Sequence, residues 1–529
     1  MKRIVGLLLC LIMVVSCIAC GKQTAKTETP TTAAAEAPKE GVKAAEEPAK
    51  PEPKYQETIT IGLEADMTKL DFQDSGSVID RAASRLTHDC LVRVNAETRT
   101  VEPCLATSWE QDKDNDAVWK FHLREGVVFN NGNPLTAEDV VFSFTRGKEK
   151  TQAKSKLSSV VSTVAEDDKT VVVTLKVANS DILYILADNT CAILDKESFD
   201  TMEEEEALKV GTGAYKCIEW KQGDQATYTA VDTCWEGVPK TKNIVFKYIP
   251  EAAARLVALQ TGEIDVARTP AATDRSFIEE DPNLILRDMT GTNVRYIWFN
   301  HKVEPFNNPT LRKAVCYALD RDEIIALVYN NIAAEKLETI GYPGQEFYTS
   351  DVTKYDYNPE KAKELLAEAG YPDGLEVTLT CTTAAFPKAV ATAVQSQLAK
   401  VGITVKIDTL ESATFNANTI NGPFQFAVDG YGAWTTGMDS SYRGCFYSTQ
   451  NRCGITSEKV DELIDTALAE KDPAKRAELY KELQEYLMQD AAWYTIAIEG
   501  LVAAYKKDLQ GWTLPNGTTH IYRYLYIEQ

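Results

Sequence analysis

The chain has 529 residues, too many for one small hydrophobic core, and this length predicts two or three folding units. Hydrophobic residues make up 44% and charged residues 25%, the ordinary composition of a globular protein. The formal net charge of −22 excludes a nucleic-acid-binding protein, because no basic face can be assembled to neutralise phosphates.

Residues 1–19 have the pattern of an export signal. Two basic residues precede an apolar run, Ile4 to Val15, that is shorter than the ~20 residues of a membrane-spanning helix. The following letters, SCIACG, resemble a bacterial lipobox, which implies cleavage before Cys20 and a lipid on its sulfur. Cys17 stands where that pattern usually has Leu. A CxxC redox or metal pair is the alternative, but no second pair follows.

Residues 20–54 are predicted to be a disordered tether. They consist mainly of Ala, Thr, Glu, Lys and Pro, and they cannot bury enough apolar surface to offset the entropy of ordering. As a flexible coil they would span roughly 30 Å. We therefore expect the protein to be lipid-anchored at the extracytoplasmic face of the cell membrane, on its periplasmic or extracellular side.

The body begins with short strands and helices. A polar loop at 64–79 separates the first strand from a helix that we expect to end near Leu91. The predicted elements up to residue 205 are strands Ile59–Leu63, Val118–Leu123, Gly126–Phe129 and Thr170–Lys176, and a helix from Thr136 to Phe144 that Thr136 caps.

Residues 211–266 predict a hairpin followed by a helix. The predicted elements are a tight turn at Gly211–Gly213, strands Tyr215–Trp220, Ala226–Val231 and Ile244–Ile249, a helix from Pro250 to Gly262, and a strand Glu263–Val266. No catalytic motif lies in this segment, so we interpret it as a scaffold.

From residue 294 the pattern changes to alternating strands and helices, a second α/β lobe. Its predicted elements are helices 358–369, 388–400, Glu458–Ala469 and Ala474–Met488, and a strand at Ile403–Ile407. The chain then returns to the first lobe near Leu501–Tyr505. The two crossings predict a hinge near 291–300 and 496–502.

Five blocks of sequence resemble the oligopeptide/dipeptide-type extracellular solute-binding proteins, family 5, of bacterial ABC importers. They are FHLREGVVFNNGNPLTAEDVVFSF (121–144), the segment 211–266, PFNNPTLRKAVCYALDRDEII (305–325), YNPEKAKELLAEAGYPDG (357–374) and QSQLAKVGITVKI (395–407). Because they stand in the family's order and span nearly the whole mature chain, the signal is stronger than any single motif.

This resemblance implies an α/β, two-lobed periplasmic-binding-protein-like fold of type II, with an extra subdomain at about 92–205. Lobe I is expected at 55–293 plus 500–529, and lobe II at 294–499. The implied function is capture of an oligopeptide or dipeptide in the cleft between lobes and its delivery to an ABC permease and ATPase. We expect a monomer.

The resemblance also implies ligand-binding residues. Ser75 and Gly76 match the family's Ser-Gly positions in a ligand-contacting loop. Peptide-binding members carry a Gly-Trp-x-x-Asp pattern whose Asp meets the ligand's ammonium, but here the segment 430–434 reads GYGAW and puts Trp at that position. Aromatic faces would suit side chains, sugars or cations instead. The candidates are Ser75, Gly76, Lys388, Tyr431, Gly432, Trp434, Asp439 and Tyr442.

Each candidate has a structural alternative. Trp434 could equally be a core aromatic residue, and Lys388, which roughly matches a carboxylate-binding cation of dipeptide binders, also fits an exposed lysine at the start of a helix. The loop around Ser75 could be a plain connection.

No catalytic signature occurs in the sequence. It has no phosphate-binding loop, no HExxH and no GxSxG, and its four histidines lack ligand spacing. We therefore expect no enzyme, no cofactor and no metal site. The alternatives are a non-peptide solute, such as an oligosaccharide or a nickel complex, or a peptide sensor or chaperone without transport.

Nine of the twelve cysteines lie beyond Cys20, and an odd number implies at least one free thiol. Cys445 and Cys453 flank a short loop, and Cys217 and Cys234 fall on neighbouring strands of the predicted hairpin. Both are candidate disulfides. Cys316, inside a predicted helix, is expected to be a buried thiol.

Overall fold

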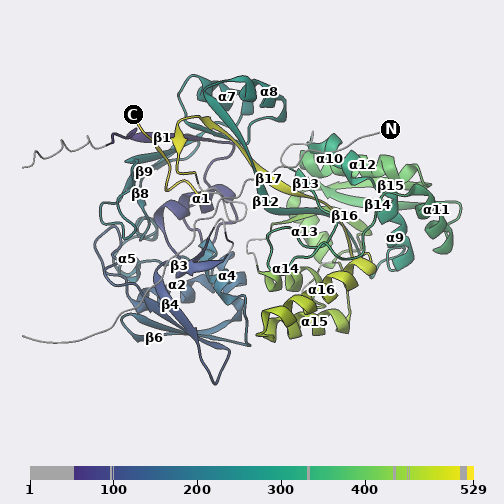
Figure 1. Cartoon of the computed structure of the whole chain (residues 1–529), viewed down its shortest axis with the longest axis horizontal. Coiled ribbons are helices and arrows are strands. Elements are labelled where there is room, and N and C mark those ends of the chain that lie inside the picture. Colours follow the sequence, from purple (N-terminus) through teal and green to yellow (C-terminus); the bar gives the residue numbers. More distant parts are fainter. Residues whose placement is uncertain are drawn as a thin grey trace, which may run out of the picture. The chain divides into compact units, whose positions relative to one another are not determined.

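An eleven-stranded mixed sheet runs through the part of the chain that the computed structural model describes, which is residues 53–95, 98, 100–329, 334–432, 437–449, 451, 453–512 and 521–529. Its strand order is β15-β14-β16-β12-β17-β11-β1-β10-β9-β8, with β13 also paired to β17. The predicted export signal and nearly all of the tether, residues 1–52, lie outside the described residues. Figure 1 shows the arrangement of the labelled elements.

The strands of the main sheet are β1 (Thr58–Leu63), β8 (Tyr215–Lys221), β9 (Gln225–Ala230), β10 (Asn243–Tyr248), β11 (Val266–Arg268), β12 (Leu284–Phe299), β13 (Ala334–Lys336), β14 (Leu375–Thr382), β15 (Ile403–Leu410), β16 (Phe426–Gly432) and β17 (Trp493–Lys506). Smaller sheets pair β4 (Ala106–Gln111), β5 (Val118–Leu123), β7 (Thr170–Leu175) and β6 (Val160–Asp167), then β2 (Val92–Val94) with β3 (Val101–Pro103), and β18 (Leu509–Gln510) with β19 (Tyr526–Ile527).

The longer helices are α1 (Val78–Thr87), α2 (Ala137–Gly147), α7 (Ala252–Gln260), α9 (Pro309–Ala318), α10 (Arg321–Tyr329), α11 (Pro359–Glu368), α12 (Ala385–Ala399), α13 (Ser412–Asn421), α14 (Met438–Phe446), α15 (Glu458–Ala469) and α16 (Pro473–Gln489). Shorter helical segments are α3 (Ala153–Lys156), α4 (Ile182–Leu186), α5 (Lys196–Thr201), α6 (Glu204–Ala207) and α8 (Arg275–Glu280).

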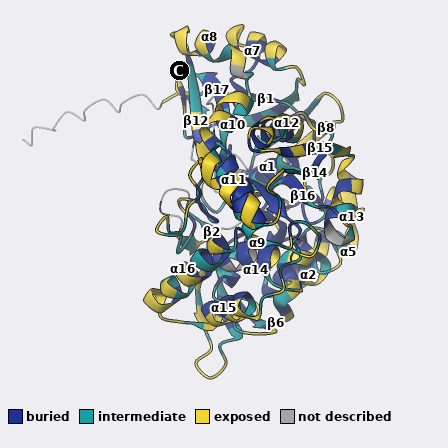
Figure 2. Cartoon of the chain, turned by 90° about the vertical axis from the view of Figure 1, so that its right-hand side faces the viewer, coloured by how far each residue is buried: buried dark blue, intermediate teal, exposed yellow. Residues whose placement is uncertain are grey.

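Two hydrophobic regions divide the body. One large cluster of buried residues runs from Val294 to Ile498, and we call the residues that carry it lobe II. The other clusters come from residues up to Met289 and from Ala503 onwards, and we call these residues lobe I. In Figure 2 the buried residues lie on the inner faces of the helices of the body and the exposed residues on the outer faces. The fold is mixed α/β with two lobes, as the sequence predicts.

The strands β12 and β17 connect the two lobes. They pair antiparallel from Leu284 to Trp298, and the register is irregular between Met289 and Asn293 and again between Arg295 and Tyr296. Figure 1 shows them crossing from the purple and blue elements to the green ones. The predicted hinge segments lie in these two strands, and the first irregularity falls beside the predicted position.

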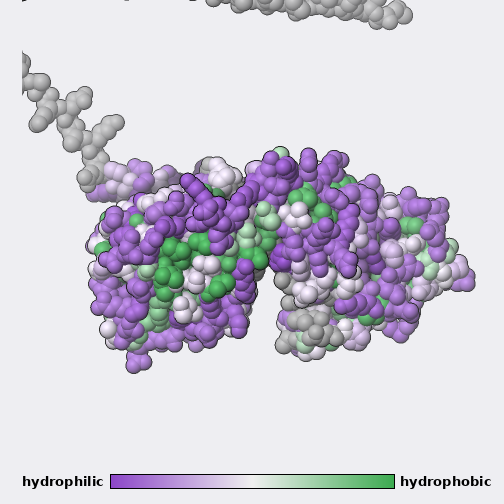
Figure 3. All heavy atoms as spheres, turned by 90° about the horizontal axis from the view of Figure 1, so that it is seen from below, coloured by the Kyte–Doolittle hydropathy of each residue, from purple (hydrophilic) through white to green (hydrophobic). Residues whose placement is uncertain are grey.

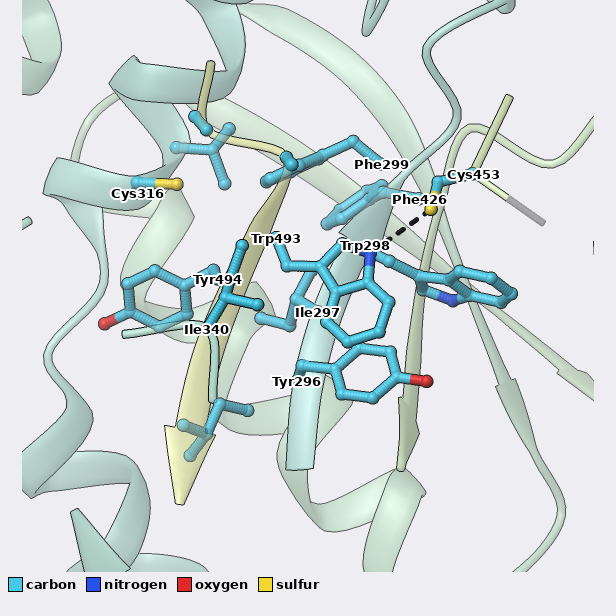
Figure 4. Packing of buried hydrophobic residues seen from close by; sticks show 14 of the residues in the cluster. Tyr296, Ile297, Trp298, Phe299, Cys316, Ile340, Phe426, Cys453, Trp493 and Tyr494 are labelled. Carbon is cyan, nitrogen blue, oxygen red and sulfur yellow. Dashed lines mark hydrogen bonds between the residues drawn. The ribbon is translucent and has the colours of Figure 1, made fainter. Parts of the chain in front are cut away.

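Aromatic residues form the centre of the lobe II core (Figure 4). The rings of Tyr296 and Trp493 stack with their centroids 3.8 Å apart and their planes 13° apart. The indole N–H of Trp493 donates a hydrogen bond to the sulfur of Cys453 at 3.2 Å. This packing fixes the lobe II half of both connecting strands.

The four-stranded sheet lies in the predicted extra subdomain. Thr136 caps α2 through a capping box with Asp139, as the sequence predicts. The predicted strand Gly126–Phe129 is wrong: this segment forms only an isolated bridge between Val128 and Pro134. Gly126, at φ +73°, bends the chain before an extended run can form.

Other predicted boundaries shift as well; α12, for example, begins at Ala385, three residues before the predicted start. α1 ends at Thr87, because His88 adopts an extended conformation. α7 begins at Ala252 with Glu251 as its N-cap, so Pro250 precedes the helix. The strand predicted at 263–266 is β11, Val266–Arg268, because Gly262, at φ +81°, and the turn after it end α7 first.

Gly211 and Gly213 are required by close contact. A Cβ atom at Gly211 would lie 2.0 Å from the carbonyl oxygen of Thr87, and one at Gly213 would lie 2.5 Å from that of Leu86. Neither glycine has a positive φ. The turn therefore packs its backbone directly against the end of α1.

The structure corrects both predicted disulfides. Cys217, Cys234, Cys445 and Cys453 are buried thiols. The sulfur of Cys453 donates to the carbonyl oxygen of Cys445 at 3.5 Å, so the hydrogen bonds of this thiol are made within the core. Cys316 is fully buried, as predicted.

Candidate functional site

A cavity of about 470 Å³ has walls from both lobes. Most of its lining comes from segments 75–81, 152–159, 176–179 and 185–190 of lobe I, and the remainder is Arg443, Gly444 and Leu468 of lobe II. Figure 3 shows a mostly hydrophilic surface that is hollowed on the face seen from below. The volume falls within the range of small-molecule sites, roughly 300–1,000 Å³.

The loop before α1 forms one edge of this cavity. Ser75 is buried, and its hydroxyl donates to the carboxylate of Asp80 at 2.6 Å. The same carboxylate accepts hydrogen bonds from the hydroxyl of Thr68 at 2.5 Å and from its amide at 2.8 Å. Asp80 therefore holds the loop on α1 and places the exposed Gly76 at the cavity.

The lobe I wall is cationic. Lys156 lies 3.6 Å from the buried carboxylate of Asp188. Burial alone would raise the pKa of Asp188, but the charges of Lys156 and Arg81 hold it below its usual value. Burial lowers the pKa of Arg81 to about 10, so this guanidinium is still charged at neutral pH. With Lys176 and Arg443, the described residues of the lining include four cations and one carboxylate.

Hydroxyl groups complete the wall. Ser155 and Ser158 donate to backbone carbonyls of their own segment, at 2.9 and 2.8 Å. The hydroxyl of Ser159 is buried and has no hydrogen-bond partner among the described residues. A ligand with acceptor atoms could be bound by this hydroxyl and by the neighbouring cations.

A buried ion pair joins the two lobes beside the cavity. Arg476 of α16 lies 2.7 Å from Asp181 of lobe I, and their side chains are 7% and 1% exposed. The hydroxyl of Ser180 also donates to the carbonyl oxygen of Leu468 at 3.2 Å. These contacts hold the lobe II wall against lobe I.

The predicted ligand-binding residues fall in different places. Ser75 and Gly76 line the cavity. Lys388 is exposed in the first turn of α12 and is not part of the lining. Tyr442 is 1% exposed in the lobe II core, where its hydroxyl donates to the carbonyl oxygen of Ile340 at 2.9 Å, and it does not line the cavity.

The remaining candidates lie at the limit of the described residues. Tyr431 and Gly432 end β16, and Asp439 is the second residue of α14, but nothing beyond their backbone is described. Trp434 is outside the described residues altogether. Their role stays a prediction.

Sequence reasoning missed the cations of the cavity. Arg81, Lys156 and the carboxylate between them, Asp188, come from three separate segments, and none of the three belongs to a motif. The only local signal is that Arg81 and Arg85 lie four residues apart and so on one side of a helix.

No cluster of three or more metal-ligating side chains occurs among the described residues. No helix in the described part of the chain combines the length and the apolar character that crossing a bilayer requires.

Comparison with known proteins places the chain among binding proteins. The model of the bacterial extracellular solute-binding proteins, family 5 (middle region), matches residues 100–452. The chain is 30% identical over 483 residues to the dipeptide-binding protein of Escherichia coli K12, which covers 84% of this chain and 90% of that protein. It is 28% identical over 451 residues to heme-binding protein A of Haemophilus influenzae, which covers 79% and 82%.

A solved structure has the same fold. It is the periplasmic binding protein DppA of Helicobacter pylori in complex with the peptide STSA, with a TM-score of 0.77 and 27% identity. The match covers 90% of this chain and 99% of that protein.

Proposed function

The chain belongs to the bacterial extracellular solute-binding proteins of family 5, and on this premise we propose that it captures an oligopeptide or dipeptide between its lobes. The single observation that supports this best is the cavity of about 470 Å³ with walls from both lobes. A solute held there contacts both lobes at once and therefore favours the state in which they meet.

The charge of the cavity supports a ligand with a carboxylate. Four cations and one acid line it, so a peptide's C-terminal carboxylate, or an acidic side chain, is bound by Arg81, Lys156, Lys176 or Arg443. This assignment replaces Lys388, which lies outside the cavity, as the carboxylate-binding residue.

Recognition of the peptide's amine would fall to the segment that ends β16. We keep Tyr431, Gly432, Trp434 and Asp439 as ligand-binding candidates, with Trp434 offering a flat apolar face where peptide binders of the family have Asp. Titration of Trp434→Ala and Asp439→Ala against the bound peptide tests this. Unchanged affinity in both variants would remove the segment from the site.

The protein acts outside the cytoplasm, tethered through a lipid on Cys20, and delivers solute as a monomer to an ABC permease and ATPase. We also propose that the lobes are divided at 293/294 and 499/500, and the ranges of the buried clusters on either side support this division. A sensor or chaperone role predicts instead that no permease or ATPase genes lie beside this one.

A non-peptide solute is the second candidate. Heme-binding protein A, at 28% identity, is nearly as similar to this chain as the dipeptide-binding protein at 30%. Relatives named for different solutes are thus about equally similar to this chain, so a non-peptide solute is tested beside the peptide.

Mass spectrometry of the purified protein under native conditions distinguishes the candidates. We expect a co-purifying molecule that fragments as a peptide of a few residues, and calorimetry with that peptide should show one site. Release of a porphyrin, a sugar or a nickel complex would overturn the peptide assignment while keeping the family role.

A further inference from the structure

A second cavity, of about 510 Å³, lies within lobe I. It is enclosed by the end of α1, the β2–β3 hairpin, residues 187–189 and the chain near the C-terminus. Among the described residues it shares no lining residue with the cavity between the lobes. Apart from Arg287, its lining comes from residues within 85–95, 102–104 and 187–189, from Trp512 and from residues within 521–524. The proposed function does not use it.

Among the described residues, four arginines and two acids line this second cavity. The acids already accept several hydrogen bonds. Asp89 accepts from Arg523 at 2.7 Å, from the indole of Trp235 at 3.0 Å and from Thr212 at 3.1 Å. Glu102 accepts from Arg93 at 2.6 Å and from Asn95 at 2.9 Å. Their charges are therefore satisfied inside the protein.

Arg523 presents one unused edge. Its residue is 7% exposed, and its Nη1 atom binds Asp89 at 2.7 Å and Glu236 at 3.2 Å. Its Nε and Nη2 atoms are buried and have no hydrogen-bond partner among the described residues. These two nitrogens form the edge of a guanidinium that binds carboxylate or phosphate with two parallel hydrogen bonds. Leaving both donors buried and unbonded is costly.

Two neighbouring arginines lack acidic partners. Neither Arg85 nor Arg287 makes an ion pair with any described residue, and the buried Nε of Arg85 has no hydrogen-bond partner there either. Arg287 donates to the carbonyl oxygen of Trp512 at 3.2 Å. Arg93, by contrast, is paired with Glu102 and with Glu236. The lining thus combines a buried guanidinium edge that has no hydrogen-bond partner among the described residues with two arginines that make no ion pair there.

We propose that this cavity is a binding site for a small anion that carries a carboxylate or phosphate group, separate from the solute site between the lobes. Arg523 binds the anionic group through Nε and Nη2, and Arg85 and Arg287 balance its charge. Asp89 and Glu236 act on Arg523 from its other edge and orient the guanidinium.

Calorimetry on the full purified protein at constant ionic strength tests the proposal, with inorganic phosphate and succinate as probes. We expect saturable binding of at least one probe at one site. The tighter probe identifies the anionic group that the site prefers.

Three variants assign the binding to the cavity. Arg523→Lys keeps the positive charge beside Asp89 but removes the two parallel N–H donors of the guanidinium. We expect this variant to weaken anion binding roughly 10- to 100-fold. Arg85→Ala alters a half-buried residue without an ion pair, so it should fold normally and weaken binding by at least roughly threefold. Arg275→Ala, which removes a half-buried lobe I arginine outside the cavity, is the matched control and should bind as wild type.

No saturable binding of either probe, or binding that Arg523→Lys and Arg85→Ala leave unchanged, would overturn the proposal. Loss of anion binding in Arg443→Ala would place the anion in the cavity between the lobes and would also overturn it. Since Arg443→Ala should weaken peptide binding and Arg85→Ala should not, failure of this proposal and failure of the proposed function give different results.

Discussion

The buried ion pair between Asp181 and Arg476 is expected to control solute affinity. Each partner comes from a different lobe, so the 2.7 Å contact exists only while the lobes meet. When they separate, both side chains can regain water. Replacing Asp181 with Asn should therefore destabilise the state in which the lobes meet, with little effect on the separated lobes.

The expected magnitude follows from the burial of the pair. Removing one partner of a fully buried ion pair costs about 3–5 kcal/mol, because the other charge is left without compensation. Here Glu346 lies 4.0 Å from Arg476 and compensates part of that charge. We therefore expect Asp181→Asn to weaken peptide binding by about 2 kcal/mol, or roughly 30-fold in Kd.

Calorimetry with the tightest-binding peptide measures this change, and X-ray scattering of the peptide-loaded protein measures whether the variant is more open. The control is Lys471→Ala, which removes the exposed interlobe pair between Lys471 and Asp116 and should change affinity by about 1 kcal/mol or less. If Asp181→Asn matched wild type in both affinity and scattering, the ion pair would have no role in closure.

Three further predictions concern stability. Burial, with a smaller contribution from Asp181, raises the pKa of Glu346 to about 7. The stabilising effect of the protonated Glu346 is therefore present below pH 4.5 and is lost as pH rises through 7, and Glu346→Gln should flatten the profile of Tm against pH in this range. Burial lowers the pKa of His88 to about 4, so the neutral imidazole stabilises the fold above pH 6.5, and about 3 kcal/mol of the free energy of unfolding is lost as pH falls towards 4. Urea unfolding at a series of pH values measures this loss, and an unchanged dependence of stability on pH in His88→Gln would contradict it. Gly211→Ala places a Cβ 2.0 Å from the carbonyl oxygen of Thr87 and should lower the free energy of unfolding by about 1–3 kcal/mol, whereas an unchanged Tm would show that the turn can move away from α1.

Apolar spacing and helix caps in the sequence predicted those helices whose ends depend on residues close together in the chain. The helix α15 has the predicted bounds, Glu458–Ala469, and Asn358 caps α11 as expected. Both depend on residues within a few positions of one another, where apolar spacing and caps act directly on the backbone. The ordered family blocks extended these local signals to the two-lobed fold.

The sequence by itself determined the fold class, the family and the two residues Ser75 and Gly76 at the cavity edge. Tertiary structure alone decided that the cavity is cationic, because Arg81, Lys156, Asp188 and Arg443 approach one another only after distant segments pack. It also decided that Tyr442 packs in a core and that the nine cysteines of the described residues are thiols. Burial and long-range proximity depend on the whole packed chain, and neither is encoded in the spacing of neighbouring residues.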